Sequence, residues 1–307
     1  MNYLSVCSGV EAATVAWHGL GFNPLAFSEI EPFPSAVLSK HYPNVPNLGD
    51  MTKYKEWNLN GTVELLVGGT PCQSFSVAGL RKGLEDPRGN LALTYVGILD
   101  KFRPKWFVWE NVPGVLSSNG GRDFGSFLGA LVELGYGFAY RVLDAQNFGV
   151  AQRRRRVFVV GCLGGWESAA KVLFESESLS GNIKQSKKTR KNITKYPPDC
   201  VGTLCARDYK GIGSFDHDKM IVHAANKCPT MTADMAGPTH SGPKVMQNMA
   251  VRRLTEIECE RLQGFPDNYT NIKENCPRGP RYKALGNSMA VPVMRWIGER
   301  IKNVKLS

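Results

Sequence analysis

The first 165 residues alternate short apolar runs with segments of helical apolar spacing, and this alternation restricts the fold of the 307-residue chain more than any other feature. Apolar runs joined by amphipathic helices are typical of βαβ units, which build α/β folds. The opening units predict a parallel sheet with right-handed crossovers and helices on both faces. Strands are expected at 4–7, 24–27, 63–67, 106–109, 138–143 and 156–162, and helices at 10–20, 32–41, 91–102 and 124–134.

The composition changes near residue 164. From 175 to 195 the chain is polar, with serine-rich and lysine-rich runs, and no helical period follows up to about residue 250. This is typical of a surface segment leading into a small, irregular domain of strands and loops. Order returns where Thr255 and Glu258 form a capping-box pattern, and a last helix is expected to follow Gly286-Asn287-Ser288 and to run to about residue 302. The predicted division is 1–164, 165–250 and 251–307, with the last part packing back on the first.

The chain carries 38 Lys and Arg against 27 Asp and Glu, a net charge of +11. Such an excess favours a polyanionic partner, although charge alone does not separate this case from a merely basic protein. No apolar run approaches membrane-spanning length, so no membrane contact is expected. The 8 cysteines form no Cys-x-x-Cys pair, so no metal site is predicted, and reduced thiols in the cytoplasm are the expectation.

Glycines and polar residues follow several expected strands, where ligands bind in open α/β sheets. The third strand leads through Gly68-Gly69-Thr70-Pro71 to Cys72, whose thiol would stand where a nucleophile is needed. A lone cysteine is more often a small buried hydrophobic residue, so the interpretation of Cys72 as a nucleophile depends on the other motifs of the chain. The Ser8-Gly9 turn would let a ligand approach the backbone, and Glu29 would accept hydrogen bonds from ribose hydroxyls. Asp50 is a candidate to hold an exocyclic amine.

Two further segments place ionisable groups at strand ends. The strand at 106–109 leads to Glu110, and burial there would raise the pKa of its carboxyl and let it donate a proton near neutral pH. Four arginines, at 153–156, open the last strand. Strand alternation would put Arg154 and Arg156 on one face, where guanidinium groups suit phosphate or a base carbonyl.

Six short motifs occur in a fixed order along the chain. They are Pro71-Cys72-Gln73, Asp86-x-Arg88-Gly89-x-Leu91, Glu110-Asn111-Val112, Gln152-x-Arg154-x-Arg156, Arg253-Leu254-Thr255 through Gln263-Gly264-Phe265-Pro266, and Gly286-Asn287-Ser288. Together they resemble the C5-cytosine-specific DNA methyltransferase family over nearly the whole chain outside 165–250. The first region departs from the family's usual Asp-x-Phe-x-Gly-x-Gly-Gly, because Ser5, Cys7, Gly9, Glu11 and Ala12 stand there; Ile30 also replaces a frequent aromatic residue.

The resemblance implies a Rossmann-like, S-adenosylmethionine-dependent methyltransferase sheet with a small target-recognition domain at 165–250. It implies methyl transfer to carbon 5 of a cytosine flipped out of a specific double-stranded DNA sequence. Cys72 would attack carbon 6, and protonated Glu110 would hold ring nitrogen 3. Arg154 would hold the ring carbonyl, and Arg156 would support Cys72 and its loop, with residues 74–88 closing over the DNA.

The same resemblance supplies binding residues by position. The cofactor residues are Cys7, Ser8, Gly9, Glu29, Asp50, Pro71, Leu91, Asn287 and Ser288. The DNA-binding residues are Gln73, Ser76, Arg81, Lys82, Gln152 and Arg207.

Two alternatives share the fold: an RNA-directed cytosine methyltransferase, and a DNA-binding relative with an inactive site. The intact set of Cys72, Glu110, Arg154 and Arg156 argues against the inactive relative. A dinucleotide oxidoreductase is disfavoured because the Gly-x-Gly-x-x-Gly turn is absent. The expected protein is a cytoplasmic monomer that acts on double-stranded DNA, either beside a separate restriction endonuclease or as a solitary enzyme.

Overall fold

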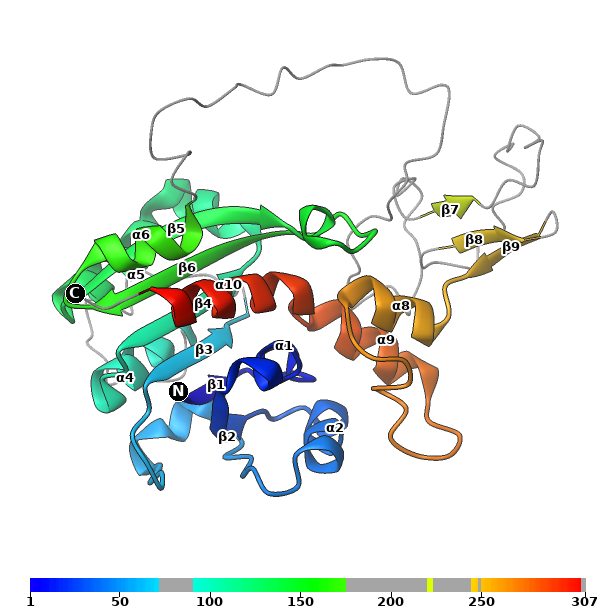
Figure 1. Ribbon diagram of the computed structural model, residues 1–307, viewed down its shortest axis with the longest axis horizontal. Coiled ribbons are helices and arrows are strands. Elements are labelled where there is room, and N and C mark those ends of the chain that lie inside the picture. Colours follow the sequence, from blue (N-terminus) through cyan, green and yellow to red (C-terminus); the bar gives the residue numbers. More distant parts are fainter. Residues whose placement is uncertain (72–90, 175–219, 223–243, 248–249, 305–307) are drawn as a thin grey trace, which may run out of the picture.

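The computed structural model describes residues 1–71, 91–174, 220–222, 244–247 and 250–304. Its main body is a six-stranded sheet with the strand order β2-β1-β3-β4-β6-β5 (Figure 1). The predicted α/β class is confirmed, and each of the six expected strands is present. The strands are β1 (Asn2–Val6), β2 (Asn23–Ser28), β3 (Leu65–Gly69), β4 (Trp106–Asn111), β5 (Tyr136–Asp144) and β6 (Arg155–Leu163).

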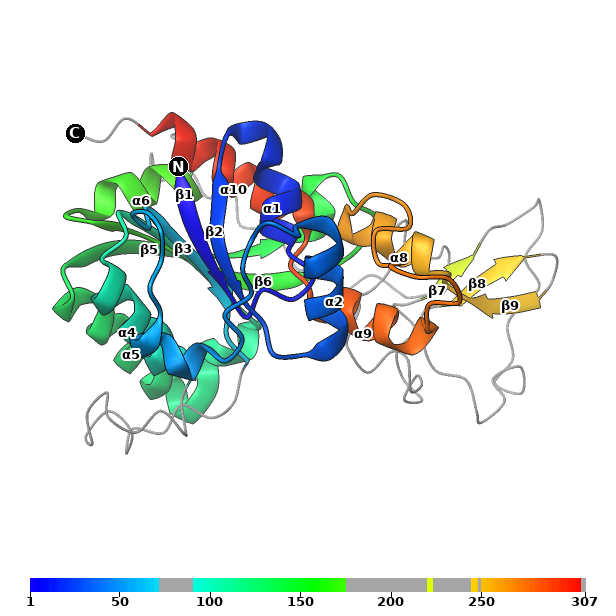
Figure 2. The same cartoon turned by 90° about the horizontal axis from the view of Figure 1, so that it is seen from below.

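Helices cover both faces of this sheet, as predicted (Figure 2). Successive side chains of a strand point to opposite faces, so Tyr3 of β1 lies in one buried cluster and Leu4 in the other. The first cluster includes α1, α6 and α10, and the second includes α4 and α5. The helices are α1 (Ala12–Trp17), α2 (Pro32–His41), α4 (Leu91–Phe102), α5 (Arg122–Glu133), α6 (Trp166–Leu173), α8 (Glu256–Gln263), α9 (Arg278–Asn287) and α10 (Val291–Asn303).

The sheet is mixed, so the prediction of a parallel sheet holds only for β1 to β4. Strand β6 runs antiparallel to both β4 and β5. The connection from β5 to β6 spans only residues 145–154 and contains one short helical turn, Ala145–Phe148. A parallel crossover needs a dozen or more residues, usually with a full helix, so this short connection returns the chain antiparallel.

Glycines continue β3 instead of ending it, which moves the strand two residues beyond the predicted 63–67. Gly68 pairs with Val6 of β1 and Trp109 of β4. A Cβ at Gly68 would lie 2.5 Å from the Val6 carbonyl oxygen, closer than side chains approach. Gly68 therefore permits close packing within the strand and carries β3 up to the site.

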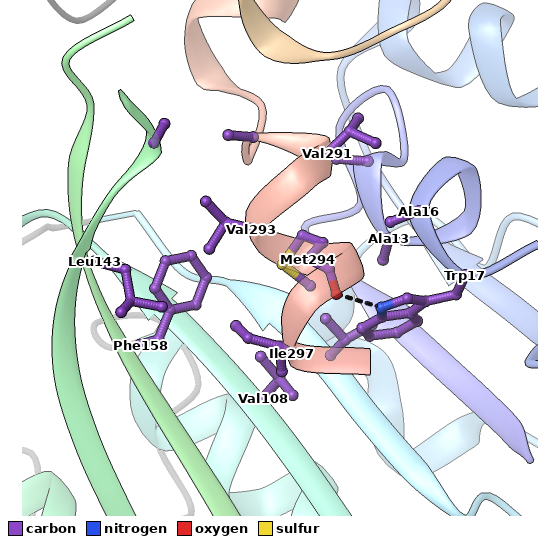
Figure 3. Close-up of a cluster of buried hydrophobic side chains, with 14 of the residues drawn as sticks. Ala13, Ala16, Trp17, Val108, Leu143, Phe158, Val291, Val293, Met294 and Ile297 are labelled. Atoms are coloured by element: carbon purple, nitrogen blue, oxygen red, sulfur yellow. Dashed lines mark hydrogen bonds between the residues drawn. The ribbon is translucent and has the colours of Figure 1, made fainter. Parts of the chain in front are cut away.

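The last long helix packs against the first one, as predicted (Figure 3). The Trp17 Nε1 atom donates a hydrogen bond of 2.6 Å to the backbone oxygen of Met294 on α10. On its other side α10 faces Phe158 of β6. This packing brings residues 286–288, which precede α10, to the carboxyl end of β1.

The segment before α9 confirms the predicted capping box. The Thr255 hydroxyl accepts from the Glu258 N–H, and the Glu258 carboxylate accepts from the Thr255 N–H at 2.7 Å. Upstream lies a three-stranded sheet of β7 (Met220–Val222), β8 (Lys244–Gln247) and β9 (Ala250–Arg253). The three-part domain division stays a prediction. Among the described residues, no helix has the length and apolar character needed to cross a membrane.

Candidate active site

A cavity of about 730 Å³ opens beyond the carboxyl ends of β1 to β4, and α9 contributes its opposite wall. Ligands of open α/β sheets bind at this end of the strands. Ser8 and Ser288 line a smaller cavity, and both cavities share Cys7, Gly9 and Asn287. The predicted site residues that line the larger cavity are Cys7, Gly9, Glu29, Asp50, Pro71, Leu91, Glu110, Arg154, Arg156 and Asn287.

Glu110 and Arg156 form an ion pair in the larger cavity. The Arg156 Nε atom lies 3.0 Å from Oε1 of Glu110, and the Glu110 residue is only 9% exposed. Burial raises the pKa of Glu110, while Arg156 and then Arg154 oppose the rise; the net direction is upward. The predicted direction is therefore confirmed. Glu110 combines a proton-donating tendency with cationic neighbours, which suits hydrogen bonding to a polar ring.

Arg154 is an anchor within the protein. Its side chain is buried, and its Nη2 atom donates to the backbone oxygens of Gly286 at 3.1 Å and Ser288 at 2.7 Å. Arg154 and Arg156 are the less exposed members of the arginine run, as strand alternation predicted, while Arg153 and Arg155 are exposed. The two inward arginines thus differ: Arg154 bonds the turn before α10, and Arg156 faces Glu110.

The end of β3 is fixed by two hydrogen bonds from β4. The Trp109 Nε1 atom donates to Oγ1 of Thr70, and the Asn111 amide donates to the Thr70 backbone oxygen, both at 3.0 Å. They fix the position of Thr70, from which the chain continues to Pro71. Cys72 lies outside the described residues, as do Gln73, Ser76, Arg81, Lys82 and Arg207, so their roles stay predictions.

The other end of the larger cavity carries two carboxylates. Glu29 accepts from the Gly9 N–H and the Glu31 N–H, both at 2.7 Å. Asp50 accepts from the Thr52 N–H through one oxygen, Oδ1, at 2.9 Å. Both carboxylates line the cavity, where they can accept hydrogen bonds from a ligand's hydroxyl or amine groups.

Cys7 occupies the turn after β1 with a left-handed backbone of φ 48°. Its Sγ atom lies 3.3 Å from Sδ of Met51. Burial, followed by the charges of Glu29 and Asp50, raises the pKa of the Cys7 thiol to about 12. The thiol is therefore protonated at neutral pH and acts as an apolar wall of the cavity, not as a nucleophile.

Gln152 was predicted to contact DNA, but it is fully buried. Its side-chain amide donates at 2.9 Å to the backbone oxygen of Leu262 on α8. The structure therefore places Gln152 between the start of β6 and α8, where its side chain has no exposed surface to offer DNA. A glutamine beside four arginines looks exposed in sequence, and only the packing of α8 buries it.

Two charged features of the site were not predicted. At the rim, Nζ of Lys283 on α9 lies 2.8 Å from the Glu31 carboxylate. Beneath the turn after β1, the Glu11 carboxyl is buried and lines the smaller cavity. No local sequence pattern pointed to Lys283, because helix α9 itself was not expected. Glu11 could have been noticed in the sequence, because it is an acidic residue at a position where the family usually has glycine.

Residues 1–303 match the family model described as C-5 cytosine-specific DNA methylase. The chain belongs to this family. The enzyme class predicted from the sequence, a DNA cytosine-5-methyltransferase, is therefore confirmed.

The relatives and the solved structure to which this chain is similar carry different names. The DNA N-6-adenine-methyltransferase of Escherichia phage P1 is 37% identical over 97% of this chain, which spans only 61% of that longer protein. The type II methyltransferase M2.BsuMI of Bacillus subtilis (strain 168) is 29% identical over 99% of this chain and 76% of its own length. The crystal structure of the S. pombe Dnmt2 methyltransferase aligns with a TM-score of 0.62 and 18% identity, covering 96% of each chain.

Proposed function

We propose that this protein transfers a methyl group from S-adenosylmethionine to carbon 5 of cytosine in a specific double-stranded DNA sequence. The observation that carries the proposal is the buried Glu110–Arg156 pair, which lies at the end of β3 that leads to Cys72. One continuous cavity contains this pair and the carboxylates Glu29 and Asp50. A base and a methyl donor can therefore meet in it.

The larger cavity fits S-adenosylmethionine. Glu29 and Asp50 offer acceptors for ribose hydroxyls and an adenine amine, and the apolar side chains of Ile30, Met51 and Leu91 also line it. Asn287 lines both cavities, as Glu110 does. When bound there, the cofactor supplies an electrophilic methyl group.

The protein's part of the reaction is to make carbon 5 of cytosine nucleophilic. The Cys72 thiolate would add to carbon 6, which breaks the ring's 5,6 double bond and pushes electrons toward nitrogen 3. Glu110 would donate a hydrogen bond or proton at nitrogen 3, offsetting the charge that develops there. After carbon 5 is methylated, loss of its proton would restore the double bond and expel Cys72.

The arginine roles differ from those expected from the sequence. Arg154 is committed to the Gly286 and Ser288 carbonyls, whereas Arg156 is beside the Glu110 carboxylate. We therefore assign the base carbonyl to Arg156, and to Arg154 the task of holding the 286–288 turn against the site. This reverses the expectation that Arg154 holds the carbonyl.

Because carbon 5 and carbon 6 are not reachable inside a stacked duplex, the cytosine must be flipped out. The predicted DNA contacts at Gln73, Ser76, Arg81, Lys82 and Arg207 remain part of this proposal. A monomer suffices, because one chain supplies both ends of the cavity. Relatives named as type II methyltransferases support a role beside a separate restriction endonuclease.

Bisulfite sequencing of plasmid DNA from cells expressing the protein tests the proposal, with Cys72→Ser as the matched control. We expect cytosines in one recurring sequence context to resist deamination by bisulfite when the wild-type protein is expressed. The same cytosines should be deaminated when the Cys72→Ser variant is expressed. Unprotected cytosines in both samples, or methylated adenine found by mass spectrometry of the hydrolysed DNA, would overturn it. The same assay on cellular RNA distinguishes an RNA substrate.

A further inference from the structure

Glu11 is the N-cap residue of α1, and in that position it carries two energetic costs. Its backbone is left-handed, with φ 63° and ψ 60°, a conformation that side-chain-bearing residues adopt rarely. Its side chain is 1% exposed, and burying a carboxyl group without a cation is unfavourable. Backbone strain of this kind persists where the surrounding structure imposes it, and it concentrates at binding sites.

The Glu11 carboxyl is held firmly in one orientation. Its Oε2 atom accepts from the Ser5 hydroxyl at 2.8 Å, and its Oε1 atom accepts from the Thr14 N–H at 3.3 Å. The first partner lies on β1 and the second on α1, so the carboxyl bridges the strand and the helix that follows it. A group this well fixed is preorganised for binding.

The smaller cavity, of about 40 Å³, has Glu11 in its wall. It shares Cys7, Gly9, Gly69, Glu110 and Asn287 with the larger cavity, and the two therefore adjoin. Its described lining contains no lysine or arginine. The space is on the scale of one small polar group, with an acid in its wall and no described protein cation opposite.

The ionisable groups around Glu11 do not compensate its charge. Tyr3 of β1 faces it, as do Tyr42 after α2, Tyr269 after α8, and Glu29 after β2. None of these groups is a cation. Burial, opposed by the hydrogen bonds from Ser5 and Thr14, raises the pKa of Glu11 to about 7.

We propose that Glu11 is a cofactor-binding residue whose carboxylate balances the ammonium charge at the amino-acid end of S-adenosylmethionine. The proposal rests on the proposed function and names a contact that the family's sequence pattern does not predict. The amino-acid end is the small, charged part of that cofactor, whereas adenine and ribose need the larger cavity with Glu29 and Asp50.

Ser5 and Glu11 reach the same place in the site. The Ser5 hydroxyl donates to Oε2 of Glu11 at 2.8 Å, and both residues line the smaller cavity. A carboxyl group at position 5 would therefore lie in the same neighbourhood as the one that Glu11 supplies.

Charge balance makes the contact measurable without any turnover. In the free protein near pH 6.5, most Glu11 carboxyls carry a proton. An ammonium bound beside the carboxyl favours its ionised form, so cofactor binding expels that proton to solvent. Below pH 7 the affinity should therefore weaken by up to about tenfold for each pH unit.

Isothermal titration calorimetry of S-adenosylmethionine at pH 6.5, in buffers of different ionisation enthalpy, counts the released protons. Wild-type protein should release up to about one proton; Glu11→Gln should release markedly fewer and bind roughly 10- to 100-fold more weakly at pH 8. Glu133→Gln is the matched control, because Glu133 is an exposed carboxyl on α5 that lines neither cavity and should leave the Glu11 proton release in place. S-adenosylhomocysteine, which keeps the ammonium and lacks the sulfonium, should release as many protons as the methyl donor.

Equal proton release by wild type and Glu11→Gln, or unchanged affinity at pH 8, would overturn the role of Glu11. No release with S-adenosylhomocysteine would also overturn the assignment to the ammonium. Failure of the wild-type protein to bind S-adenosylmethionine at all would count against the proposed function itself. Glutamine at position 11 can still form hydrogen bonds with Ser5 and Thr14, so Glu11→Gln should fold. A reciprocal Ser5→Asp/Glu11→Gly variant should recover pH-dependent binding. Together the two variants separate an effect of charge from misfolding.

Discussion

Glu110 shows how one carboxyl can be kept ready to donate a proton beside two arginines. Burial favours its neutral form, and Arg156 and Arg154 favour its charged form. Because the net direction of the pKa is upward, the protonated fraction at neutral pH exceeds that of an exposed glutamate. A base that accumulates negative charge at its ring nitrogen gains from such a donor, and a base in its ground state gains less.

Glu110→Gln should lower the single-turnover methylation rate by roughly 10²- to 10⁴-fold, because an amide can hydrogen-bond but cannot donate a proton. Binding of S-adenosylmethionine should stay within a few-fold of wild type. Rapid-quench assays with labelled cofactor measure the first quantity, and calorimetry the second. Glu133→Gln, an exposed residue on α5, serves as control and should leave the rate unchanged. A Glu110→Gln rate near that of wild type would remove the acid from the mechanism.

Arg154 bonds to the protein backbone, so its replacement should mainly lower the free energy of unfolding. Arg154→Lys would weaken the bonds to the Gly286 and Ser288 carbonyls and lower the free energy of unfolding by about 2 kcal/mol. Arg155→Lys, on an exposed residue next in sequence, should stay within about 0.5 kcal/mol of wild type. Urea denaturation followed by tryptophan fluorescence compares the two; equal midpoints would show that the Arg154 bonds contribute little.

The raised pKa of Glu11 also predicts how the cofactor-free protein responds to pH. Between about pH 4.5 and about pH 7 the unfolded chain has lost this proton and the folded chain has kept it, so stability falls as pH rises. The full penalty, about 3 kcal/mol, is present above pH 7. Glu11→Gln lacks this penalty, so its advantage over wild type should grow from pH 5 to pH 8. Urea titrations across this range measure it, and an advantage that does not change with pH would contradict the prediction.

At the scale of elements, the packing of α10 on α1 decides whether the two ends of the chain meet at the site. Gly298 of α10 faces Trp17, and a Cβ there would lie 2.3 Å from the indole Nε1. Gly298→Ala should therefore destabilise the fold by about 1–3 kcal/mol through overpacking. The control is Gly129→Ala on α5, where a Cβ meets nothing within 4 Å; it should stabilise by about 0.5–1 kcal/mol. Chemical denaturation gives both values, and a Gly298→Ala protein as stable as wild type would indicate that the helices can separate slightly.

Sequence patterns predicted the elements whose shape is determined locally. The helix Pro32–His41 has its predicted bounds, and the helix at residue 256 begins at the predicted capping box. Helix α9 was missed because its stretch, Arg278–Asn287, contains Gly279, Pro280 and Gly286, which are poor helix formers. Contacts distant in sequence hold it, such as the bond from the Gln263 amide to the Leu285 backbone oxygen.

The same distinction between local and distant contacts explains the site. Glu110 and the inward pair Arg154 and Arg156 were predicted, because strand ends and strand alternation are local features. The burial of Gln152 by α8 and the bonds from Arg154 to residues 286 and 288 join positions more than 100 residues apart. No periodicity within a strand encodes such contacts, so the roles of the two arginines could be assigned only from the structure.

At the scale of the whole molecule, residues from the beginning and from the end of the chain enclose the same site. The Tyr269 hydroxyl donates to the Val10 backbone oxygen at 2.9 Å, and Lys283 pairs with Glu31 across the rim of the larger cavity. Cavity walls that come from residues 7–50 and 279–287 must be assembled together. Cofactor binding should therefore stabilise both of these segments together, not one of them alone.

The net charge of +11 predicts that the affinity of the protein for DNA depends strongly on salt concentration. If binding neutralises 6–10 phosphates, roughly, the affinity for a duplex should fall by about 10³- to 10⁵-fold between 50 and 200 mM salt, because counterions released from DNA drive the association. The proposed cofactor site is a cavity, where the local interactions are screened less, so the affinity for S-adenosylmethionine should change only by about threefold over the same range. Fluorescence anisotropy of a labelled duplex and calorimetry of the cofactor, in identical buffers, measure the two dependences side by side. A DNA affinity as insensitive to salt as that of the cofactor would mean that the excess charge is not directed at phosphates, and that contacts to bases, not to the backbone, hold the duplex.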